Sequence, residues 1–315
     1  MNKKEQQWNE TYLVGFGKHA KNKLLPALIK TNPNNISIVT KKIIDTNQIN
    51  HCFESIDEAL KNASKKSLFI LSSPPNLHYK QAVKILNAGF DLMVEKPAFL
   101  SKEKLKEVQN ISKRNGCLLI EMFMYMENDS FKKLTNIIKT KANHISKIYF
   151  DFIIPSVPKN TFRNESSLDT SLLADMGCYP LSFLSYAELG KNLNFTIKKR
   201  FINDNHPFFL IETKCQSINI SIGCAKEYKN KIKIDFVDNS SVECERFFYG
   251  VPSEKEINWE IEGKSFNEKI YEKNAFEKLF LRTRESWRKS QLVRFEKMIT
   301  ITDNLIKLGN FLEIY

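Results

Sequence analysis

The chain contains 315 residues, more than one ordinary domain requires, and 42 % of them are hydrophobic, which is enough to fill two cores. No apolar run reaches the ~18 residues of a membrane span, and no apolar signal region follows the polar amino terminus. We therefore expect a cytoplasmic protein with no membrane partner. The net charge of +12 comes from lysines spread along the whole chain, without a basic-aromatic motif or zinc-finger spacing. This excess favours an anionic small molecule and no nucleic-acid partner.

The cysteines are scattered, and no two of them form a C-x-x-C pair. Several fall in apolar segments, where a thiol behaves as a small hydrophobe. We therefore expect reduced, structural thiols and no metal site at Cys52, Cys117, Cys178, Cys215, Cys224 and Cys244.

A glycine motif follows the first predicted strand. Residues 11–14 read as a buried strand, and the run Gly-Phe-Gly-Lys-His-Ala at 15–20 leads directly into a helical pattern. This is the G-x-G-x-x-G/A arrangement of a dinucleotide-binding turn. Gly15 permits the tight turn, Gly17 lets the backbone approach a diphosphate, and Ala20 keeps the helix close to the strand. The alternative is a strand-to-helix turn that binds no ligand.

The second predicted strand, residues 36–39, ends in Thr40-Lys41-Lys42. An NAD-selective fold usually has a carboxylate here, roughly 20 residues after the glycines. A hydroxyl and two ammonium groups take its place, and they suit the additional phosphate of NADP. We therefore expect NADP as the cofactor, with NAD less favoured. The alternative is that both lysines are merely solvated.

Helices and strands alternate through the rest of the first half, as in a doubly wound parallel sheet. The pattern predicts helices over residues 53–60, 77–88 and 101–114, and strands over 67–71, 91–95 and 117–120. Gly89 and Gly116 mark the ends of two of these helices.

The strand over residues 91–95 ends abruptly in an acid, a lysine and a proline, Glu95-Lys96-Pro97. Ligands of open α/β sheets bind beyond the carboxyl ends of the strands, so Lys96 would stand where chemistry takes place. Pro97 fixes its own φ and restricts Lys96 to extended geometry, which holds the lysine in one orientation. The alternative is an ordinary strand followed by a loop and a helix from Ser101.

The hydrophobic pattern changes after about residue 146, where predicted strands with alternating residues, joined by short polar turns, replace the alternation of strands and helices. The strands are predicted over 148–152, 195–201, 208–224, 231–237 and 257–261. The pattern indicates a second α/β domain with a large, mainly antiparallel open sheet. A final amphipathic helical stretch runs from about residue 275. We place the boundary between residues 122 and 123.

A second chemical constellation lies within residues 169–180. On a helix, Asp175 and Tyr179 are four residues apart and share a face. A tyrosine hydroxyl can donate a proton to a carbonyl if a nearby ammonium lowers its pKa, and Lys96 could supply that ammonium. The alternative is an aspartate at a helix start and a half-buried core tyrosine.

Five segments carry a family resemblance. In chain order they are Gly15-Phe16-Gly17, Ser73-Pro74-Pro75-Asn76-Leu77-His78, Glu95-Lys96-Pro97, Glu121-Met122-Phe123-Met124-Tyr125, and Phe162-Arg163 with Asp175-Met176-Gly177-Cys178-Tyr179-Pro180. They resemble the nucleotide loop and the T-P-N-x-x-H, E-K-P, E-A-F-M-Y and F-R…D-x-G-C-Y-P segments of the Gfo/Idh/MocA oxidoreductases. The last two are typical of the branch with glucose-fructose oxidoreductase, dimeric dihydrodiol dehydrogenase and sugar-nucleotide ketoreductases.

The resemblance implies a Rossmann domain over residues 1–122 that binds NAD(P), and an α/β domain over 123–315 that binds substrate and forms a homo-oligomer through its open sheet. It implies a nicotinamide cofactor and a sugar-like substrate. Lys96 would hydrogen-bond the reacting oxygen, Tyr179 would be the acid/base, and Asp175 would orient the substrate or the catalytic pair. The cofactor-binding residues that we expect are Gly15, Phe16, Gly17, Ala20, Thr40, Lys41, Ser73, Pro74, His78, Glu95, Lys96 and Arg163.

Three departures from the branch leave the substrate open. Met126 stands where an arginine is usual, Asn128-Asp129 replaces His-Pro, and Asp169-Thr170-Ser171 replaces a glycine run. Three functions therefore stay in view: reduction of a keto-sugar that is linked to a nucleotide, the same chemistry on a free sugar, cyclitol or small diol, and a dinucleotide-binding sensor without catalysis.

Overall fold

A computed structural model of the chain describes residues 8–31, 35–41, 49–156, 172–203, 206–213 and 218–313. The chain divides into two compact units. The first contains residues 1–123 and 276–299, and the second contains residues 124–275 and 300–315.

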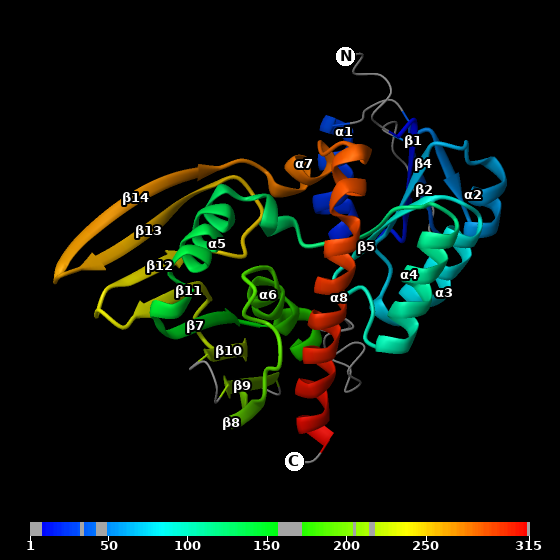
Figure 1. The fold of residues 1–315 in the computed structure, drawn as a ribbon. Coiled ribbons are helices and arrows are strands. Elements are labelled where there is room, and N and C mark those ends of the chain that lie inside the picture. The colour runs from blue at the N-terminus through cyan, green and yellow to red at the C-terminus, as the bar shows by residue number, and fades with distance from the viewer. Residues whose placement is uncertain are drawn as a thin grey trace. The chain divides into compact units, whose positions relative to one another are not determined.

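The first unit is built on a six-stranded parallel sheet (Figure 1) in the order β3-β2-β1-β4-β5-β6. Its strands are β1 Glu10–Val14, β2 Ile36–Val39, β3 His51–Phe53, β4 Ser67–Leu71, β5 Asp91–Glu95 and β6 Leu119–Met122. This is the strand order of the Rossmann fold, in which the order reverses beside the first strand and opens a crevice at the carboxyl ends. The predicted doubly wound parallel sheet is confirmed.

Helices connect these strands because apolar residues recur at helical spacing between them. They are the π-type turn η2 Ala20–Leu24, α1 Leu25–Thr31, α2 Ile56–Asn62, α3 Pro75–Asn87 and α4 Lys102–Arg114, joined late in the chain by α7 Ala275–Phe280 and the first half of α8 Arg284–Glu313. Ser55 and Ser101 cap α2 and α4 with their side chains. Helices α2, α3, α4 and α8 share one core with one face of the sheet.

Asp91, the first residue of β5, joins distant parts of this unit. Its buried carboxylate accepts hydrogen bonds from Trp8 Nε1 at 2.8 Å, from Arg284 Nε at 2.5 Å and from the Leu118 backbone N at 2.8 Å. A buried charge that is paired and fully hydrogen-bonded is stable. Asp91 therefore anchors the amino-terminal segment and the start of α8 to β5.

The second unit contains an eight-stranded sheet in the order β14-β13-β12-β11-β7-β10-β9-β8. Its strands are β7 Ile145–Ile154, β8 Phe195–Asn203, β9 His206–Thr213, β10 Ile218–Cys224, β11 Lys229–Phe236, β12 Ser241–Glu245, β13 Ser253–Ile261 and β14 Lys264–Glu272. Only β7 and β10 pair in parallel; the other described neighbours are antiparallel. The predicted mainly antiparallel sheet is confirmed.

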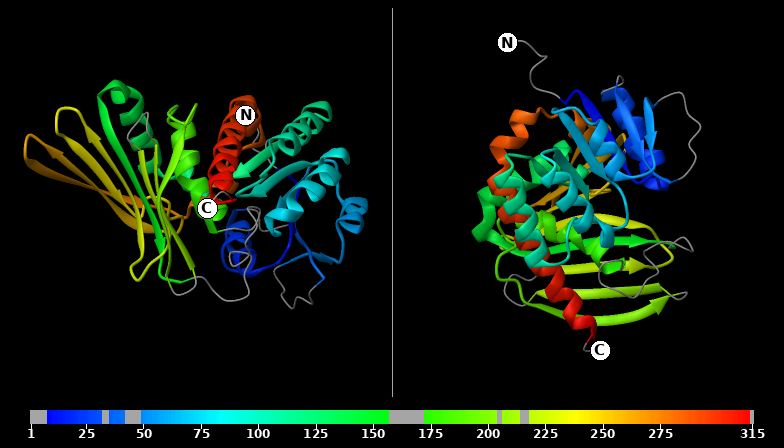
Figure 2. Two further views of the ribbon diagram at one scale, coloured as in Figure 1. Left: turned by 90° about the horizontal axis from the view of Figure 1, so that it is seen from below. Right: turned by 90° about the vertical axis from the view of Figure 1, so that its right-hand side faces the viewer.

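Two helices, α5 Asp129–Lys141 and α6 Leu172–Tyr186, lie on one face of this sheet (Figure 2, left). The short helical turns η3 Met124–Glu127 and η4 Ala142–His144 flank α5. Helix α6 is buried from Leu172 to Ser185. It packs closely on β10, because a Cβ on Gly177 would stand 3.5 Å from Ile222 Cδ1.

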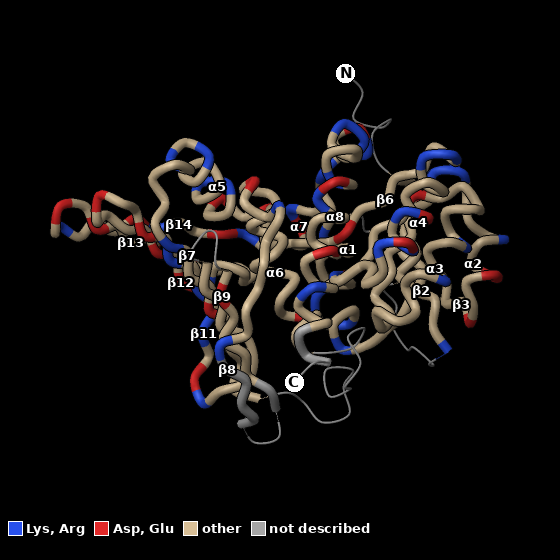
Figure 3. Tube along the Cα trace, turned by 60° about the horizontal axis from the view of Figure 1, so that its bottom comes forward, with Lys and Arg blue, Asp and Glu red and all other residues tan. Residues whose placement is uncertain are grey.

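Residues of both charges lie along the strands of this sheet (Figure 3). Along β11, buried residues alternate with half-buried charged ones. Lys231 pairs with Glu243 at 3.1 Å, and Lys233 pairs with Asp235 at 3.0 Å. Homo-oligomerisation through this sheet stays a prediction.

The structure corrects several predicted elements. Residues 208–224, expected as one strand, form β9 and β10, and the helix expected over 53–60 begins at Ile56, after the short strand β3. Helix α5 and strands β12 and β14 have no counterpart among the predicted elements. None of the described helices is long and apolar enough to cross a membrane.

Candidate active site

The glycine motif forms the turn between β1 and the first helix. Gly15 has a φ of +87°, and a Cβ there would stand 2.9 Å from the backbone N of Ser73, so this turn requires glycine. No atom lies within 4 Å of the place that a Cβ of Gly17 would take. The Lys21 N–H donates to the Gly17 carbonyl oxygen at 3.0 Å, and Ala20 behind it is buried. Phe16 is half-buried. The turn leaves one glycine open beside a helix start, as a bound diphosphate needs.

The end of β2 lies beside this turn. The Gly15 N–H donates to the Val39 carbonyl oxygen at 2.9 Å, and the Thr40 N–H donates to that of Phe53 at 2.8 Å. Thr40 is half-buried and Lys41 is exposed. Lys42 lies outside the described residues. The described end of β2 therefore presents a hydroxyl and an ammonium group.

The turn from β4 to α3 contains Ser73 and Pro74, with Pro74 directly before the first residue of the helix. The Ser73 hydroxyl donates to Gln81 Oε1 at 2.5 Å. His78 is fully buried, with Nε2 2.9 Å from the Ser73 carbonyl oxygen and Nδ1 3.1 Å from that of Ala98. Burial lowers the pKa of His78, so the neutral ring donates to one of these two acceptors. His78 therefore joins this turn to the one after β5, and its own contact with a cofactor stays a prediction.

Lys96 follows β5 directly and is half-buried, and the Lys96–Pro97 peptide bond is cis. Two carboxylates hold the backbone of this turn. The Lys96 N–H donates to Glu95 Oε2 at 3.2 Å, and the Ala98 N–H donates to Glu121 Oε1 at 2.8 Å. The His78 ring lies within hydrogen-bonding distance of the Ala98 carbonyl oxygen. Side chains thus pair with backbone N–H and C=O groups that have no strand partner after the chain turns out of β5.

Glu121 on β6 is 9 % exposed and lies beside the end of β5. Burial raises its pKa to about 7, against the opposing effects of the Ala98 N–H and the Lys96 charge. The nearby Glu95 carboxylate adds to the rise. A carboxyl that ionises near neutral pH therefore stands close to Lys96.

His19 connects the glycine turn to Glu95. Its Nε2 lies 2.9 Å from Glu95 Oε1, and its ring meets the edge of Phe276 at a centroid distance of 5.6 Å. The sequence motifs predict no role for His19 or Glu121. Their partners are 76 and 23 residues away in the chain, so spacing along the sequence carried no signal for these contacts.

In the second unit, α6 carries the predicted pair. Asp175 is 4 % exposed and Tyr179 is 7 % exposed, one helical turn apart. Aromatic rings surround Tyr179, with centroid distances of 5.1 Å to Phe152, 5.3 Å to Phe248 and 5.7 Å to Tyr125. These contacts fix the plane of the Tyr179 ring.

Tyr125 on η3 is fully buried beside Tyr179. Its hydroxyl lies 2.8 Å from Ser182 Oγ and donates to the Tyr179 carbonyl oxygen at 3.3 Å. Burial raises the pKa of Tyr125 well above its ordinary value. Tyr125 is therefore placed as a support for α6, and it is a poor proton donor to a substrate.

Two parts of the predicted site remain without a structural account. Arg163 and the run Asp169-Thr170-Ser171 lie outside the described residues. Lys96 belongs to the first unit, whereas Asp175 and Tyr179 belong to the second. The catalytic pairing of Lys96 with Tyr179 stays a prediction.

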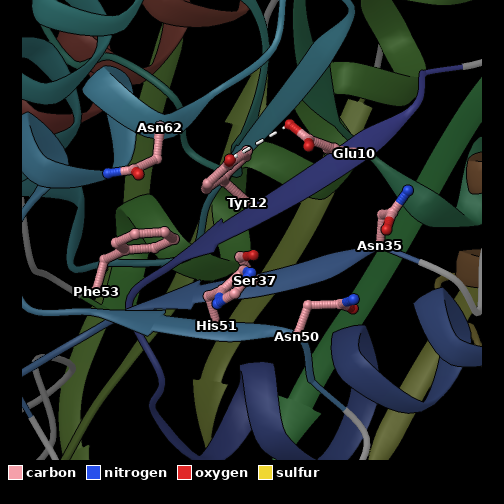
Figure 4. Close-up of a pocket in the computed structure, with 8 residues that line it drawn as sticks. All are labelled: Glu10, Tyr12, Asn35, Ser37, Asn50, His51, Phe53 and Asn62. Atoms are coloured by element: carbon pink, nitrogen blue, oxygen red, sulfur yellow. Dashed lines mark hydrogen bonds between the residues drawn. The ribbon is translucent and has the colours of Figure 1, made fainter.

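A separate pocket of about 190 Å³ opens at the amino ends of β1, β2 and β3 (Figure 4), at the edge of the sheet opposite to the glycine turn. Glu10 accepts hydrogen bonds there from Tyr12 and from the Ser67 hydroxyl. The lining residues are Glu10, Tyr12, Asn35, Ser37, Asn50, His51, Phe53 and Asn62.

Among the described residues, no group of three or more His, Cys, Asp or Glu could hold a metal ion.

Residues 11–123 match the sequence model of the Gfo/Idh/MocA group, described as an oxidoreductase family with an NAD-binding Rossmann fold. Residues 11–123 therefore resemble the Rossmann domain of that family. The matched segment includes the glycine turn, the Ser73 turn and the Glu95-Lys96-Pro97 turn. The predicted family resemblance is confirmed.

Curated relatives match this chain in part. A dTDP-3,4-didehydro-2,6-dideoxy-α-D-glucose 3-reductase from Actinomadura kijaniata is 24 % identical over 123 residues, which are 39 % of this chain and 37 % of the relative. An uncharacterized oxidoreductase, ORF334, from Rhizobium meliloti is 21 % identical over 178 residues, 54 % of this chain and 53 % of the relative. The chain thus spans about half or less of the length of these relatives.

Solved structures share the fold over nearly the whole chain. KijD10, a 3-ketoreductase from Actinomadura kijaniata in complex with NADP and TDP-benzene, has a TM-score of 0.76 and 16 % identity over 94 % of this chain and 95 % of its own. An aldose-aldose oxidoreductase from Caulobacter crescentus complexed with glycerol has a TM-score of 0.73 and 14 % identity over 96 % of both chains. At these identities the likeness establishes the fold alone.

Proposed function

We propose that the chain is an NADP-dependent oxidoreductase that transfers hydride between nicotinamide and a keto group or hydroxyl of a sugar-like substrate, in the first place a sugar linked to a nucleotide. The observation that carries the proposal is the glycine turn in the segment that matches the Gfo/Idh/MocA model. Gly15 has no room for a Cβ beside Ser73, and no atom lies within 4 Å of the place of a Cβ on Gly17. The turn after β5 then carries Lys96 at the carboxyl end of another strand of the same sheet.

The residues present fit a dinucleotide. The open backbone at Gly17 and the helix behind it would hold the diphosphate. Thr40 and Lys41 would hold the additional phosphate of NADP, which a carboxylate at this position would repel. When bound, the cofactor supplies or accepts the hydride. The structural relative KijD10 is in complex with NADP, which agrees with this choice.

Lys96 and Tyr179 would perform the proton chemistry. An ammonium group that donates a hydrogen bond to the carbonyl oxygen polarises it and stabilises the charge that develops there. The Tyr179 hydroxyl would then deliver the proton to that oxygen during reduction and remove it during oxidation. Asp175, on the same face of α6, would orient the substrate or the pair.

Two observations bear on the substrate class. One relative is a reductase of a dTDP-linked keto-sugar, and KijD10 is in complex with TDP-benzene. An aldose-aldose oxidoreductase with glycerol and a scyllo-inositol dehydrogenase from Lactobacillus casei share the same fold, so a free sugar, cyclitol or diol is the second candidate class.

Turnover and binding together test the proposal. NADPH oxidation is measured with dTDP- and UDP-linked keto-sugars and with free keto-sugars, and binding of dTDP and UDP alone is measured by calorimetry. We expect turnover of a linked sugar and nucleoside diphosphate binding that weakens with added salt, since phosphates must meet fixed cations. Turnover of a neutral sugar without nucleoside diphosphate binding would select the second class. Absence of any dinucleotide-dependent turnover would contradict the proposal that the chain is an enzyme.

A further inference from the structure

We propose that the Glu121 carboxylate is a positioning group for Lys96: it fixes the backbone of the turn that carries Lys96 and keeps the Lys96 side chain charged as an ammonium. The inference rests on the proposed function, in which this ammonium meets the reacting oxygen.

The placement of Glu121 is set by strand register. β5 and β6 are parallel neighbours, with Val94 opposite Glu121 and Glu95 opposite Met122. The Glu121 side chain therefore lies beside the last residues of β5, just before the chain turns at Lys96. Its Oε1 accepts the Ala98 N–H at 2.8 Å, which ties the exit of β5 to β6.

The hydrogen bond alone does not require a carboxylate. A glutamine in the same place could accept the Ala98 N–H through its amide oxygen, without the cost of burying a charge. Glu121 is 9 % exposed, so its ionised form needs a compensating cation. When it is ionised, Glu121 therefore interacts with a nearby cation as well as with the Ala98 N–H.

The charged and titratable groups near Glu121 point to Lys96 as its counterpart. Lys96 stabilises the ionised carboxylate, and Glu95, on the same turn, opposes it. Glu95 is in turn paired with His19. His78, which packs against the turn from α3, is kept neutral by burial. Electrostatic coupling is mutual, so the Glu121 carboxylate stabilises the Lys96 ammonium in the same measure.

The test measures the reactivity of the Lys96 amine in the folded protein, without substrate or cofactor. Only the neutral amine reacts with acetic anhydride, so trace acetylation quantified by mass spectrometry reports its deprotonated fraction. In Glu121→Gln, which keeps the acceptor for Ala98, we expect Lys96 to acetylate about tenfold faster at a given pH, as loss of a nearby opposite charge implies. The other lysines of the same sample are internal standards. Glu107→Gln, an exposed change on α4, is the matched control.

Unchanged Lys96 acetylation in a folded Glu121→Gln would overturn the proposal and leave Glu121 as a backbone acceptor only.

A second measurement applies if the Glu121→Gln variant folds poorly. In Lys96→Met with ¹³C-labelled glutamate, the carboxyl that titrates near pH 7 in the wild type should move to higher pH, and an unmoved resonance would contradict the coupling. Both readouts are independent of turnover, so a failed proposed function and a failed coupling are distinguishable. If the enzyme is active, Glu121→Gln should also alter the pH profile of kcat while NADPH binding is retained.

Discussion

Individual residues of the first unit illustrate what a local motif can and cannot predict. Gly15 was predicted as the tight turn of a dinucleotide loop, and its positive φ and close approach to Ser73 match that role. Lys96 was predicted at the carboxyl end of a buried strand, where it lies. Glu121 and His19 received no role, because their contacts depend on how strands and helices far apart in the chain come together.

We expect Lys41 to determine the preference for NADPH over NADH. Lys41→Asp should weaken NADPH binding at least about tenfold while affecting NADH less, because it removes a charge-assisted contact to the additional phosphate and introduces repulsion. Fluorescence titration of both cofactors measures this change. Lys106→Asp, an exposed change on α4, is the control. Equal losses for NADPH and NADH would place the phosphate contact elsewhere.

Tyr179→Phe and Lys96→Met should each retain folding and cofactor binding but lower turnover by roughly 10²–10⁴-fold, the usual contribution of a positioned acid. Tyr79→Phe, whose hydroxyl donates to Glu107 on the surface, should keep wild-type turnover. Steady-state kinetics with the best substrate decide the matter. Near-normal turnover of Tyr179→Phe would show that another group donates the proton.

Glu121 gives the first unit a defined pH dependence. Burial raises its pKa from an ordinary 4.5 to about 7, so the folded state holds this proton more tightly, and the resulting stability is lost as pH rises through that interval. The free energy of unfolding of the wild type, relative to Glu121→Gln, should fall by about 3 kcal/mol between these values. Urea unfolding of both proteins across this range measures the difference. A constant difference would contradict the raised pKa.

At the scale of elements, the sequence pattern predicted those with a clear apolar period. Helix α4, with its Ser101 cap, begins and ends within a residue of expectation. β14 was missed because it is exposed along most of its length and shows no alternation, and β3 because it has three residues. α5 was missed in part because its first N–H groups are satisfied from another element: Glu272 at the end of β14 accepts the Asp129 and Ser130 N–H groups at 3.1 and 2.8 Å.

This capping by Glu272 yields a stability prediction. Glu272 is fully buried, and Glu272→Ala removes the acceptor of one buried and one partly buried backbone N–H at the start of α5. We expect a loss of at least about 1.5–3 kcal/mol in the free energy of unfolding, the usual value for hydrogen bonds to a charged group. The control is Glu268→Ala, which removes a surface ion pair with Lys133 and should cost about 0–1 kcal/mol. Equal midpoints for the two variants in urea unfolding would contradict the capping role.

At the scale of the whole molecule, the change of the hydrophobic pattern near residue 146 predicted the second, mainly antiparallel sheet. The return of residues 276–299 to the first unit could not be read from the sequence. It depends on contacts between segments far apart in the chain. Phe295 and Met298 pack in the core of the first unit. Gln109 Nε2 donates to the Phe295 carbonyl oxygen at 3.0 Å, and Arg288 donates to that of Gly116 at 2.8 Å. A periodic pattern predicts a helix there but not its partner.

The central claim is that the first unit of this chain binds NADP(H) for hydride transfer. Its most direct test is an equilibrium titration of the wild-type protein with NADPH and with NADH, followed by nicotinamide fluorescence and repeated with Gly15→Ala. We expect saturable binding of one NADPH per chain, weaker binding of NADH, and loss of binding in Gly15→Ala, since the added Cβ would stand 2.9 Å from Ser73 N and displace the turn. A folded wild-type protein that binds neither dinucleotide would contradict it.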